Sequence, residues 1–282
     1  MKSLITILLI LFFISSEGIA QYDCGSFEGC LSVGISAYQE ENYEGAVGYL
    51  TNAIKNWKRV YGLTKLNSAY LYRGNSYLEM DSIKRAIGDY TQILWPNGKD
   101  PEAFRMRAKA LEKQGNYDGA LNDLTSVIKL EGKAEDYATR GIVYGKIEKF
   151  QTAIEDLTKA IALQPNWVDY YLKRAQIYYL MEKYDAALQD ASKAQDLNAI
   201  IPDPYTFSAT VYLKMEKFNE ALEQMNSAIT FAPEEAQLYA TRGMVFNKLN
   251  KKDESIADLK KAVDMGFAEA KEILKSLYKI DY

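Results

Sequence analysis

An arginine followed sixteen residues later by an aspartate recurs five times in this sequence of 282 residues. The pairs are Arg73–Asp89, Arg107–Asp123, Arg140–Asp156, Arg174–Asp190 and Arg242–Asp258. A guanidinium fork binds both oxygens of a carboxylate, so each arginine could hold its own aspartate or the carboxylate of a ligand. Where the surrounding pattern lacks the arginine, the aspartate is missing too: Val33 goes with Tyr49, and Ser208 with Gln224. This joint loss favours structural ion pairs over an array of ligand-binding arginines.

The composition offers little for catalysis. The sequence has no histidine, the side chain that most often serves as a general base and binds metal ions. It contains no phosphate-binding glycine loop and no metal-ligand motif, and no two carboxylates stand out as a glycosidase pair. A net charge of −4 gives no general attraction to nucleic acid or to an anionic membrane. We therefore predict a protein that is not an enzyme and that needs no cofactor or metal.

A small residue recurs at a regular period, which indicates an array of helical hairpins. It occurs in steps of 33 or 34 residues, at Gly74, Ala108, Gly141, Ala175, Ala209 and Gly243. A weaker copy of the pattern begins near Phe27 and has Gly34 at this position. Two short helices cannot bury their apolar face alone, so neighbouring hairpins must stack. Each arginine and its aspartate would lie on the two helices of one hairpin. We expect their pairing to fix register more than stability, because desolvation offsets much of the attraction.

Other positions repeat in the same register, and together they resemble the tetratricopeptide repeat family. The first helices carry aromatic residues at Tyr70, Phe104, Tyr137, Tyr171, Tyr205 and Tyr239. The second helices carry alanines at Ala86, Ala120, Ala153, Ala187 and Ala221, and closing prolines occur at Pro165 and Pro233. The resemblance implies an all-α, right-handed superhelical solenoid of seven hairpins with a C-terminal capping helix. The hairpins would span about residues 27–60, 67–100, 101–133, 134–167, 168–201, 202–235 and 236–266, and the capping helix 267–282.

The first twenty residues have the pattern of a secretory signal peptide. Lys2 precedes an apolar run from Leu4 to Ile14, and small residues up to Ala20 favour cleavage before Gln21. The apolar run is too short to span a bilayer comfortably. We therefore expect an exported protein, periplasmic or secreted, that does not stay in the membrane after cleavage.

Two cysteines, Cys24 and Cys30, follow directly after this segment. In an oxidising compartment we expect them to form a structural disulfide that fixes the entry to the first helix. A metal site would need further ligands, and a redox-active pair is disfavoured because the spacing differs from that of the usual motif.

The step between the first two repeats is 40 residues, so about six extra residues fall between Lys55 and Leu66. This segment contains the cations Lys55, Lys58, Arg59 and Lys65 and the aromatic residues Trp57 and Tyr61. One interpretation is a longer second helix with a solvated basic face. The other is a projecting basic and aromatic contact surface.

The family resemblance also places certain first-helix residues in a concave groove. They are Tyr72 and Asn75 in the second repeat, Arg105, Lys109 and Lys113 in the third, Lys173 and Tyr179 in the fifth, and Phe207 in the sixth. Some relatives hold a C-terminal carboxylate with lysine, asparagine and arginine, but Thr139 stands where the asparagine is expected. The three cations of the third repeat predict that an acidic, extended peptide binds across the second and third repeats. The alternative is a solvated helix face balanced by Glu102 and Glu112.

The resulting prediction is a non-catalytic scaffold that binds a protein or peptide partner in its groove, in the cell envelope or outside the cell. This follows from the fold that the resemblance implies, which indicates a class of function and not a partner. Two alternatives remain: an envelope enzyme or glycan-binding protein that uses groove carboxylates, and a self-assembling structural component. The sequence leaves the oligomeric state open.

Overall fold

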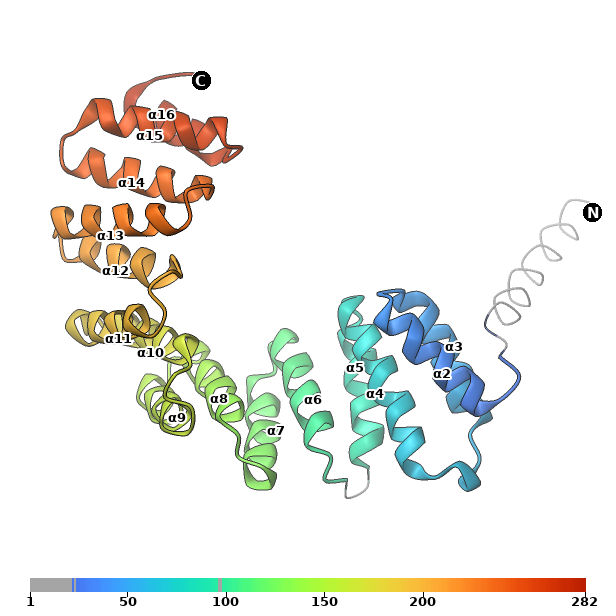
Figure 1. Cartoon of the computed structure of the whole chain (residues 1–282). Coiled ribbons are helices and arrows are strands. Elements are labelled where there is room, and N and C mark those ends of the chain that lie inside the picture. Colours follow the sequence, from blue (N-terminus) through green and yellow to red (C-terminus); the bar gives the residue numbers. More distant parts are fainter. Residues whose placement is uncertain (1–21, 23, 96–97) are drawn as a thin grey trace, which may run out of the picture. The chain divides into compact units, whose positions relative to one another are not determined.

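The computed structural model describes residues 22, 24–95 and 98–282, and its regular elements are all helices (Figure 1). The predicted signal peptide, residues 1–20, lies outside the described residues. The predicted all-α array of helical hairpins is confirmed. The chain divides into two compact units, one ending at Gly132 and the other beginning at Lys133. Among the described residues, no helix combines the length and the apolar character that crossing a membrane requires.

The described part of the first unit consists of three hairpins. These are α2 (Phe27–Gln39) with α3 (Tyr43–Asn56), α4 (Leu63–Glu79) with α5 (Ile83–Leu94), and α6 (Pro101–Lys113) with α7 (Tyr117–Leu130). A 3-10 helix, η1 (Arg59–Tyr61), lies between α3 and α4.

The second unit consists of four hairpins and a final helix. The hairpins are α8 (Ala134–Lys146) with α9 (Phe150–Leu163), α10 (Val168–Leu180) with α11 (Tyr184–Leu197), α12 (Asp203–Lys214) with α13 (Phe218–Phe231), and α14 (Ala236–Lys248) with α15 (Lys252–Asp264). The final helix is α16 (Glu269–Tyr278).

The turn inside each hairpin has one residue in the left-handed region of backbone conformation. These residues have φ values between 55° and 82° and are Glu41, Asp81, Gly115, Glu148, Glu182, Glu216 and Asn250. Such a conformation costs a non-glycine residue about 1–2 kcal/mol, so the packing of the two helices must impose it. Because the same turn closes every hairpin, the step between hairpins stays nearly constant.

Small residues lie where the two helices of a hairpin cross. A Cβ atom on Gly34 would lie 2.6 Å from Cγ of Leu50, and one on Gly74 would lie 2.7 Å from the Tyr90 ring. The residues at the same position in other hairpins are at most 2% exposed, namely Ala108, Ala175 and Ala209. The crossing therefore has room for a hydrogen or a methyl group and nothing larger.

Within each unit the first helices of successive hairpins form one layer. In the first unit α4 contacts both α2 and α6, and in the second unit α10 contacts α8. Inside a unit, second helices pack between two first helices: α3 between α2 and α4, α5 between α4 and α6, α9 between α8 and α10, α11 between α10 and α12, and α13 between α12 and α14. The groove residues named from the sequence all lie on first helices: α4, α6, α10 and α12.

The insertion after the first hairpin differs from both sequence interpretations. Helix α3 ends at Asn56, and the extra residues form η1 and lengthen the N-terminal end of α4, so the second helix is not longer. The aromatic residues do not project. Trp57 and Tyr61 are half-buried against the first hairpin, and the Tyr61 ring stacks on Phe27 at 4.9 Å. An aromatic residue buries a large apolar area, which explains why both turn inward while the cations stay outside.

Helix α16 covers the end of the last hairpin. Ala270 and Leu274 are fully buried against Leu259 and Ala262 of α15. The hydroxyl of Tyr278 also donates a hydrogen bond to Asn247 Oδ1 on α14, at 2.9 Å. A stack of hairpins exposes apolar surface at its end, and α16 removes it from water.

Candidate functional site

Each of the five arginines binds the aspartate sixteen residues after it through two parallel hydrogen bonds. Nε and Nη2 of Arg140 donate to the two carboxylate oxygens of Asp156 at 2.7 and 2.8 Å. The pairs Arg73–Asp89, Arg107–Asp123, Arg174–Asp190 and Arg242–Asp258 have the same geometry, with distances of 2.7 to 2.9 Å. The aspartates are only 4–7% exposed. Both charges of each pair are therefore bound inside the hairpin and are not available to a ligand.

Four of these arginines also reach back to the preceding hairpin, a contact that the sequence did not predict. Nη1 of Arg174 donates to the hydroxyl of Thr158 on α9, at 2.8 Å. Arg73, Arg107 and Arg242 do the same, at 2.9 to 3.1 Å, with Thr51, Thr91 and Asn226. A signal existed, because a hydroxyl or amide residue recurs at this position of the second helices. The arginine thus links two successive hairpins.

The repeated aromatic residues flank these guanidinium groups. Cζ of Arg140 lies 5.9 Å from the ring centres of both Tyr137 and Tyr144, and Cζ of Arg242 lies 5.6 Å from those of Tyr239 and Phe246. At these distances the rings attract the cation. The hydrogen bond with its aspartate raises the pKa of Arg140, and the same cause raises the pKa of Arg242.

The sixth hairpin replaces this arrangement with a neutral one. Ser208 and Gln224 occupy the arginine and aspartate positions, and Gln195 of α11 reaches into the space between them. Its Nε2 donates to Gln224 Oε1 at 3.0 Å, to Ser208 Oγ at 3.3 Å and to the carbonyl of Pro204 at 3.4 Å. One amide from the preceding hairpin therefore takes the place of an ion pair.

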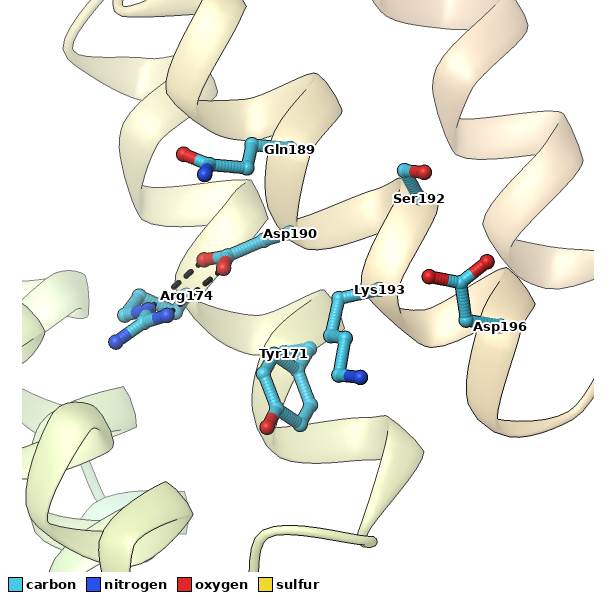
Figure 2. A pocket seen from close by; sticks show the side chains of 7 residues that line it. All are labelled: Tyr171, Arg174, Gln189, Asp190, Ser192, Lys193 and Asp196. Atoms are coloured by element: carbon cyan, nitrogen blue, oxygen red, sulfur yellow. Dashed lines mark hydrogen bonds and ion pairs between the residues drawn. The ribbon is translucent and has the colours of Figure 1, made fainter.

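A polar cleft of about 460 Å³ opens beside the Arg174–Asp190 pair, between α10 and α11 (Figure 2). In Figure 2 the guanidinium and the carboxylate face each other, while Lys193 extends past the Tyr171 ring. The remaining lining comes from Gln189, Ser192 and Asp196. Because Arg174 is held by Asp190, the charged groups left in the cleft are the cation of Lys193 and the carboxylate of Asp196. The cleft therefore favours neither an anionic nor a cationic ligand.

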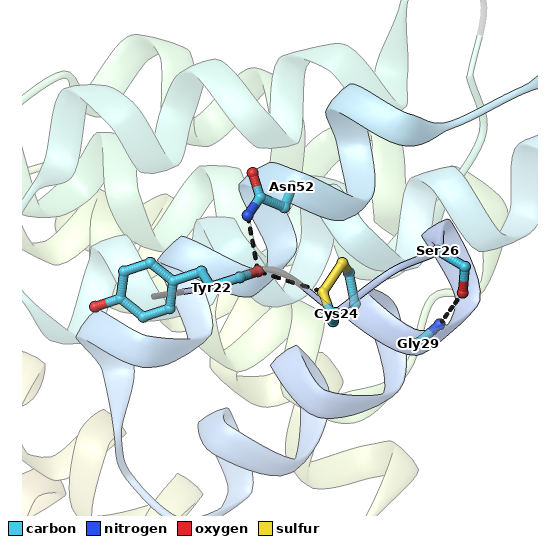
Figure 3. Close-up of a disulfide and its surroundings, with 6 residues drawn as sticks. Tyr22, Cys24, Ser26, Gly29 and Asn52 are labelled. Carbon is cyan, nitrogen blue, oxygen red and sulfur yellow. Dashed lines mark hydrogen bonds between the residues drawn. A yellow bond between two sulfur atoms is a disulfide. The ribbon is translucent and has the colours of Figure 1, made fainter. Parts of the chain in front are cut away.

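The two cysteines form a disulfide at the start of the first hairpin (Figure 3). It joins the segment before α2 to the first turn of that helix, with a Cα–Cα distance of 5.0 Å. The carbonyl of Tyr22 accepts a hydrogen bond from Asn52 Nδ2 of α3, at 2.8 Å. The Tyr22 ring packs directly on Gly48: a Cβ atom at residue 48 would lie only 2.5 Å from the nearest ring carbon of Tyr22. These contacts hold the N-terminal segment against α3.

In the first unit, the predicted groove residues Tyr72 and Asn75 are half-buried. The Tyr72 ring meets Tyr38 edge-on at 5.4 Å, so it connects the first helices of two hairpins. Asn75 Oδ1 accepts a hydrogen bond from the hydroxyl of Tyr90, at 2.8 Å. Burial raises the pKa of Tyr38, the phenol whose ring Tyr72 contacts.

The third-repeat cations do not form the free patch that the sequence predicted. Arg105 is paired with Glu131 at the end of α7 and lies 3.6 Å from Glu102. Its side chain is only 18% exposed, whereas Lys109 and Lys113 are exposed. The structure therefore fits the alternative of a helix face balanced by carboxylates. Glu131 was missed because it follows the end of the second helix, 26 residues further along the chain.

In the second unit, the predicted groove residues form an aromatic contact. The Tyr179 ring of α10 meets Phe207 of α12 edge-on at 6.1 Å and Tyr184 of α11 at 5.8 Å. On the same helix Lys173 lies 3.9 Å from Asp169, and Leu180 is 56% exposed. This part of the first-helix surface is mostly apolar.

An apolar groove of about 440 Å³ lies between α14 and α16, and it was not predicted. Met244 and Leu277 are 40% and 42% exposed there, Ile273 lines it, and Lys248 and Glu272 lie at its edges. The sequence predicts only a capping helix here. Ala270 and Leu274 of α16 cover the last hairpin, whereas Ile273 and Leu277 lie on the side of the groove. Among the described residues, no group of three or more cysteine, aspartate or glutamate side chains could hold a metal ion.

Comparison with known proteins agrees with the repeat pattern. Family models described as tetratricopeptide repeat match residues 139–199 and 236–265. The human tetratricopeptide repeat protein 13 is 31% identical over 106 residues, which is 36% of this chain and 12% of that protein. The chain therefore matches only a small part of this curated relative.

Two solved structures show the same fold. A tetratricopeptide repeat protein from Parabacteroides merdae has a TM-score of 0.68 and 21% identity, and the match covers 90% of this chain and 97% of that one. YrrB, described as a tetratricopeptide repeat protein with an unusual peptide-binding site, has a TM-score of 0.50 and 19% identity over 67% of this chain and 98% of its own. The repeat positions, the hairpin stacks and the two matching models agree: residues 139–199 and 236–265 are tetratricopeptide repeats, and the chain has the fold of a tetratricopeptide repeat protein.

Proposed function

We propose that the chain is a non-catalytic scaffold that binds a segment of a partner protein along the face of its first helices. The observation that carries this proposal is the apolar groove between α14 and α16, because a large thioether and aliphatic side chains stay exposed there. Exposed apolar surface edged by charges is typical of protein interaction sites. Methionine suits such a role because its flexible side chain adapts to different partners.

The partner of this groove would contribute an apolar anchor, with polar residues near Lys248 and Glu272. The same first-helix layer carries Tyr179 and Phe207 two hairpins earlier, so a longer segment could contact both places within the second unit. In the first unit an acidic residue of a partner would meet Lys109 and Lys113, since Arg105 is already paired. The description of YrrB as having a peptide-binding site is consistent with this class of function.

We place this activity in the cell envelope or outside the cell. The pattern of residues 1–20 supports export, and the disulfide between Cys24 and Cys30 supports an oxidising compartment. An enzymatic role has no support of comparable weight, because five of the buried aspartates are each held by an arginine.

The test is affinity capture from cell-envelope extract with residues 21–282 as bait, followed by mass spectrometry. Met244→Asp puts a charge in the groove and should reduce capture of the partner by about tenfold or more, since an unpaired charge in an apolar contact is costly. Met80→Asp is the matched control, because Met80 is 43% exposed, close to the 40% of Met244, and lies in the first unit. Equal capture by both variants would contradict the proposal. A concentration-dependent mass in light scattering, without any captured partner, would favour the self-assembling alternative.

A further inference from the structure

The insertion after the first hairpin exposes two aliphatic side chains on its outward side. Val60 in η1 is 83% exposed, and Leu63 at the start of α4 is 67% exposed. Single exposed aliphatic residues are common on protein surfaces. Two of them within four residues, at one turn of the chain, call for a physical explanation.

The turn that carries them is fixed from inside. The Tyr61 ring stacks on Phe27, and Trp57 Nε1 donates a hydrogen bond to the carbonyl of Gly62 at 3.1 Å. The backbone closes on itself, with Tyr61 N–H bonded to the carbonyl of Lys58 at 2.9 Å. Exposure of Val60 and Leu63 is thus a consequence of an ordered turn, so little conformational entropy would be lost when they contact another surface.

The surroundings of this turn are strongly positive. Residues 45–78 contain no aspartate or glutamate, although the whole chain has 38 acidic residues and a net charge of −4. Two cations of this stretch are neutralised from outside it, Lys65 by Glu28 and Arg73 by Asp89. Lys55, Lys58 and Arg59 are exposed and form no ion pair with any described residue. The local charge around Val60 and Leu63 is therefore opposite in sign to that of the whole protein.

We propose that this turn docks the protein on an anionic lipid surface, with Val60 and Leu63 entering the interfacial layer and Lys55, Lys58 and Arg59 lying among the headgroups. Cations beside exposed aliphatic side chains are the combination that favours binding at such an interface. Exposed aliphatic side chains with cations beside them fit a soft, flat lipid surface directly, whereas a folded acidic protein would need a matching hollow. The net charge of the chain opposes non-specific adsorption, so this turn would also set the orientation of the protein on the surface.

The experiment is co-sedimentation of residues 21–282, which include every described residue, with lipid vesicles. Vesicles of phosphatidylcholine mixed with phosphatidylglycerol should bind the protein, and pure phosphatidylcholine should bind it at least about tenfold less. Added salt should weaken the binding by screening. The Lys58→Glu/Arg59→Glu variant should lose binding about tenfold or more, and the Val60→Ser/Leu63→Ser variant should lose it without any change of charge.

The matched control is Lys214→Glu/Lys217→Glu, which makes the same change of charge at exposed positions around the turn between α12 and α13 and should keep vesicle binding. Circular dichroism should show the same helical content in all variants, because every altered side chain is exposed. The proposal is overturned if the unaltered protein ignores phosphatidylglycerol vesicles, if the control loses as much binding as the turn variants, or if the serine variant binds fully. Equally tight binding to polyglutamate, lost in the same turn variants, would overturn it in favour of an acidic protein partner.

Discussion

At the scale of single residues, the recurring arginine has three tasks at once. Its fork closes the hairpin through an aspartate, and its flat face lies beside one or two aromatic rings. In four of the five arginines, the remaining nitrogen also donates a hydrogen bond to the preceding hairpin. A lysine could not do this, because its ammonium group is a point charge without a planar fork. The arginine side chains are 15–21% exposed and the aspartate side chains, taken without their backbone, are 6–10% exposed, so each pair is largely desolvated. Such a pair gives specificity more than stability, because desolvation offsets most of the attraction.

Removing one partner of such a pair should therefore cost more than removing both. Asp156→Asn leaves the Arg140 cation buried beside a neutral amide that has only one acceptor oxygen. We expect the free energy of unfolding to fall by about 2–3 kcal/mol. Arg140→Met on top of it should restore part of that loss, which urea denaturation of the four proteins of a double-mutant cycle would measure. Asp196→Asn, at an exposed aspartate of α11, is the control and should change little. Additive effects of the two substitutions would show that the pair does not act as a unit.

The pairing within a hairpin was predictable, because a constant spacing and a joint loss of both charges are visible in the sequence. The reach to the preceding hairpin was not. Arg107 and Thr91 are 16 residues apart, but Arg73 and Thr51 are 22 apart because the insertion lies between them. A contact between hairpins depends on which side of the preceding helix a short hydroxyl faces, and that is set by the packing of the two hairpins.

At the scale of helices, the second hairpin shows how one large residue changes a crossing. The position is Leu50, Leu124, Leu157 or Leu259 in other hairpins, but it is Tyr90 in α5, where the ring is fully buried. Gly74 on α4 makes room for this ring, and Asn75 on the same helix accepts its hydroxyl proton in a hydrogen bond. The crossing of α4 and α5 therefore depends on three residues that belong together.

This crossing should make the protein sensitive to alkaline pH. Burial raises the pKa of Tyr90 well above its ordinary value, while in the unfolded chain the phenol ionises near pH 10. Its contribution to stability is therefore complete below about pH 10 and is lost as the pH rises further, because only the unfolded chain gains the charge. Tyr90→Phe should cost about 1 kcal/mol at neutral pH, through the lost hydrogen bond. Above pH 10 the stability of the Tyr90→Phe variant should fall less steeply than that of the unaltered protein. The two slopes should differ by up to about 1.4 kcal/mol per pH unit.

Urea denaturation of both proteins at neutral and at alkaline pH measures this difference, and each protein at neutral pH is its own reference. Parallel losses of stability above pH 10 would contradict a buried neutral phenol at this crossing.

The limits of sequence reasoning at this scale are clearest at the insertion. A step of 40 residues told how long the extra segment is, but not which helix would take it up. In the structure the extra residues form η1 and the start of α4. The chain leaves the helical path of α3 there because Trp57 and Tyr61 bury apolar area against the first hairpin. Likewise, the repeat pattern marked Tyr171, Tyr205 and Tyr239 as recurring aromatic residues of the first helices. It could not show that their hydroxyls donate to the carbonyls of Pro165, Ala199 and Pro233 in the loops between hairpins.

At the scale of the whole molecule, each unit is a row of hairpins in which stability comes from each hairpin and from its contacts with its neighbours. The period predicted this architecture and the number of hairpins, because it reflects one stacking geometry used repeatedly. It did not predict where a functional surface would lie, since exposure of Met244 or Val60 depends on side chains that the stack leaves uncovered. Function in this fold therefore has to be sought at departures from the repeat, such as the end helix, the insertion and the sixth hairpin.

The sixth hairpin should be the place where the second unit opens first. The link from α11 to this hairpin includes the amide of Gln195, in place of an arginine that binds an aspartate and the preceding helix. Gln195→Ala removes three hydrogen bonds at this junction and leaves Gln224 Oε1 without the donor that it has in the structure. The free energy of unfolding should fall by about 1–2 kcal/mol. In a row of hairpins that loss should appear as faster hydrogen exchange throughout α12–α16, with α8–α10 unchanged. Gln189→Ala is the matched control, because Gln189 is an exposed glutamine on the same helix and should leave exchange unaltered. An equal rise in exchange across the whole second unit would mean that its hairpins unfold together and that this junction has no special weakness.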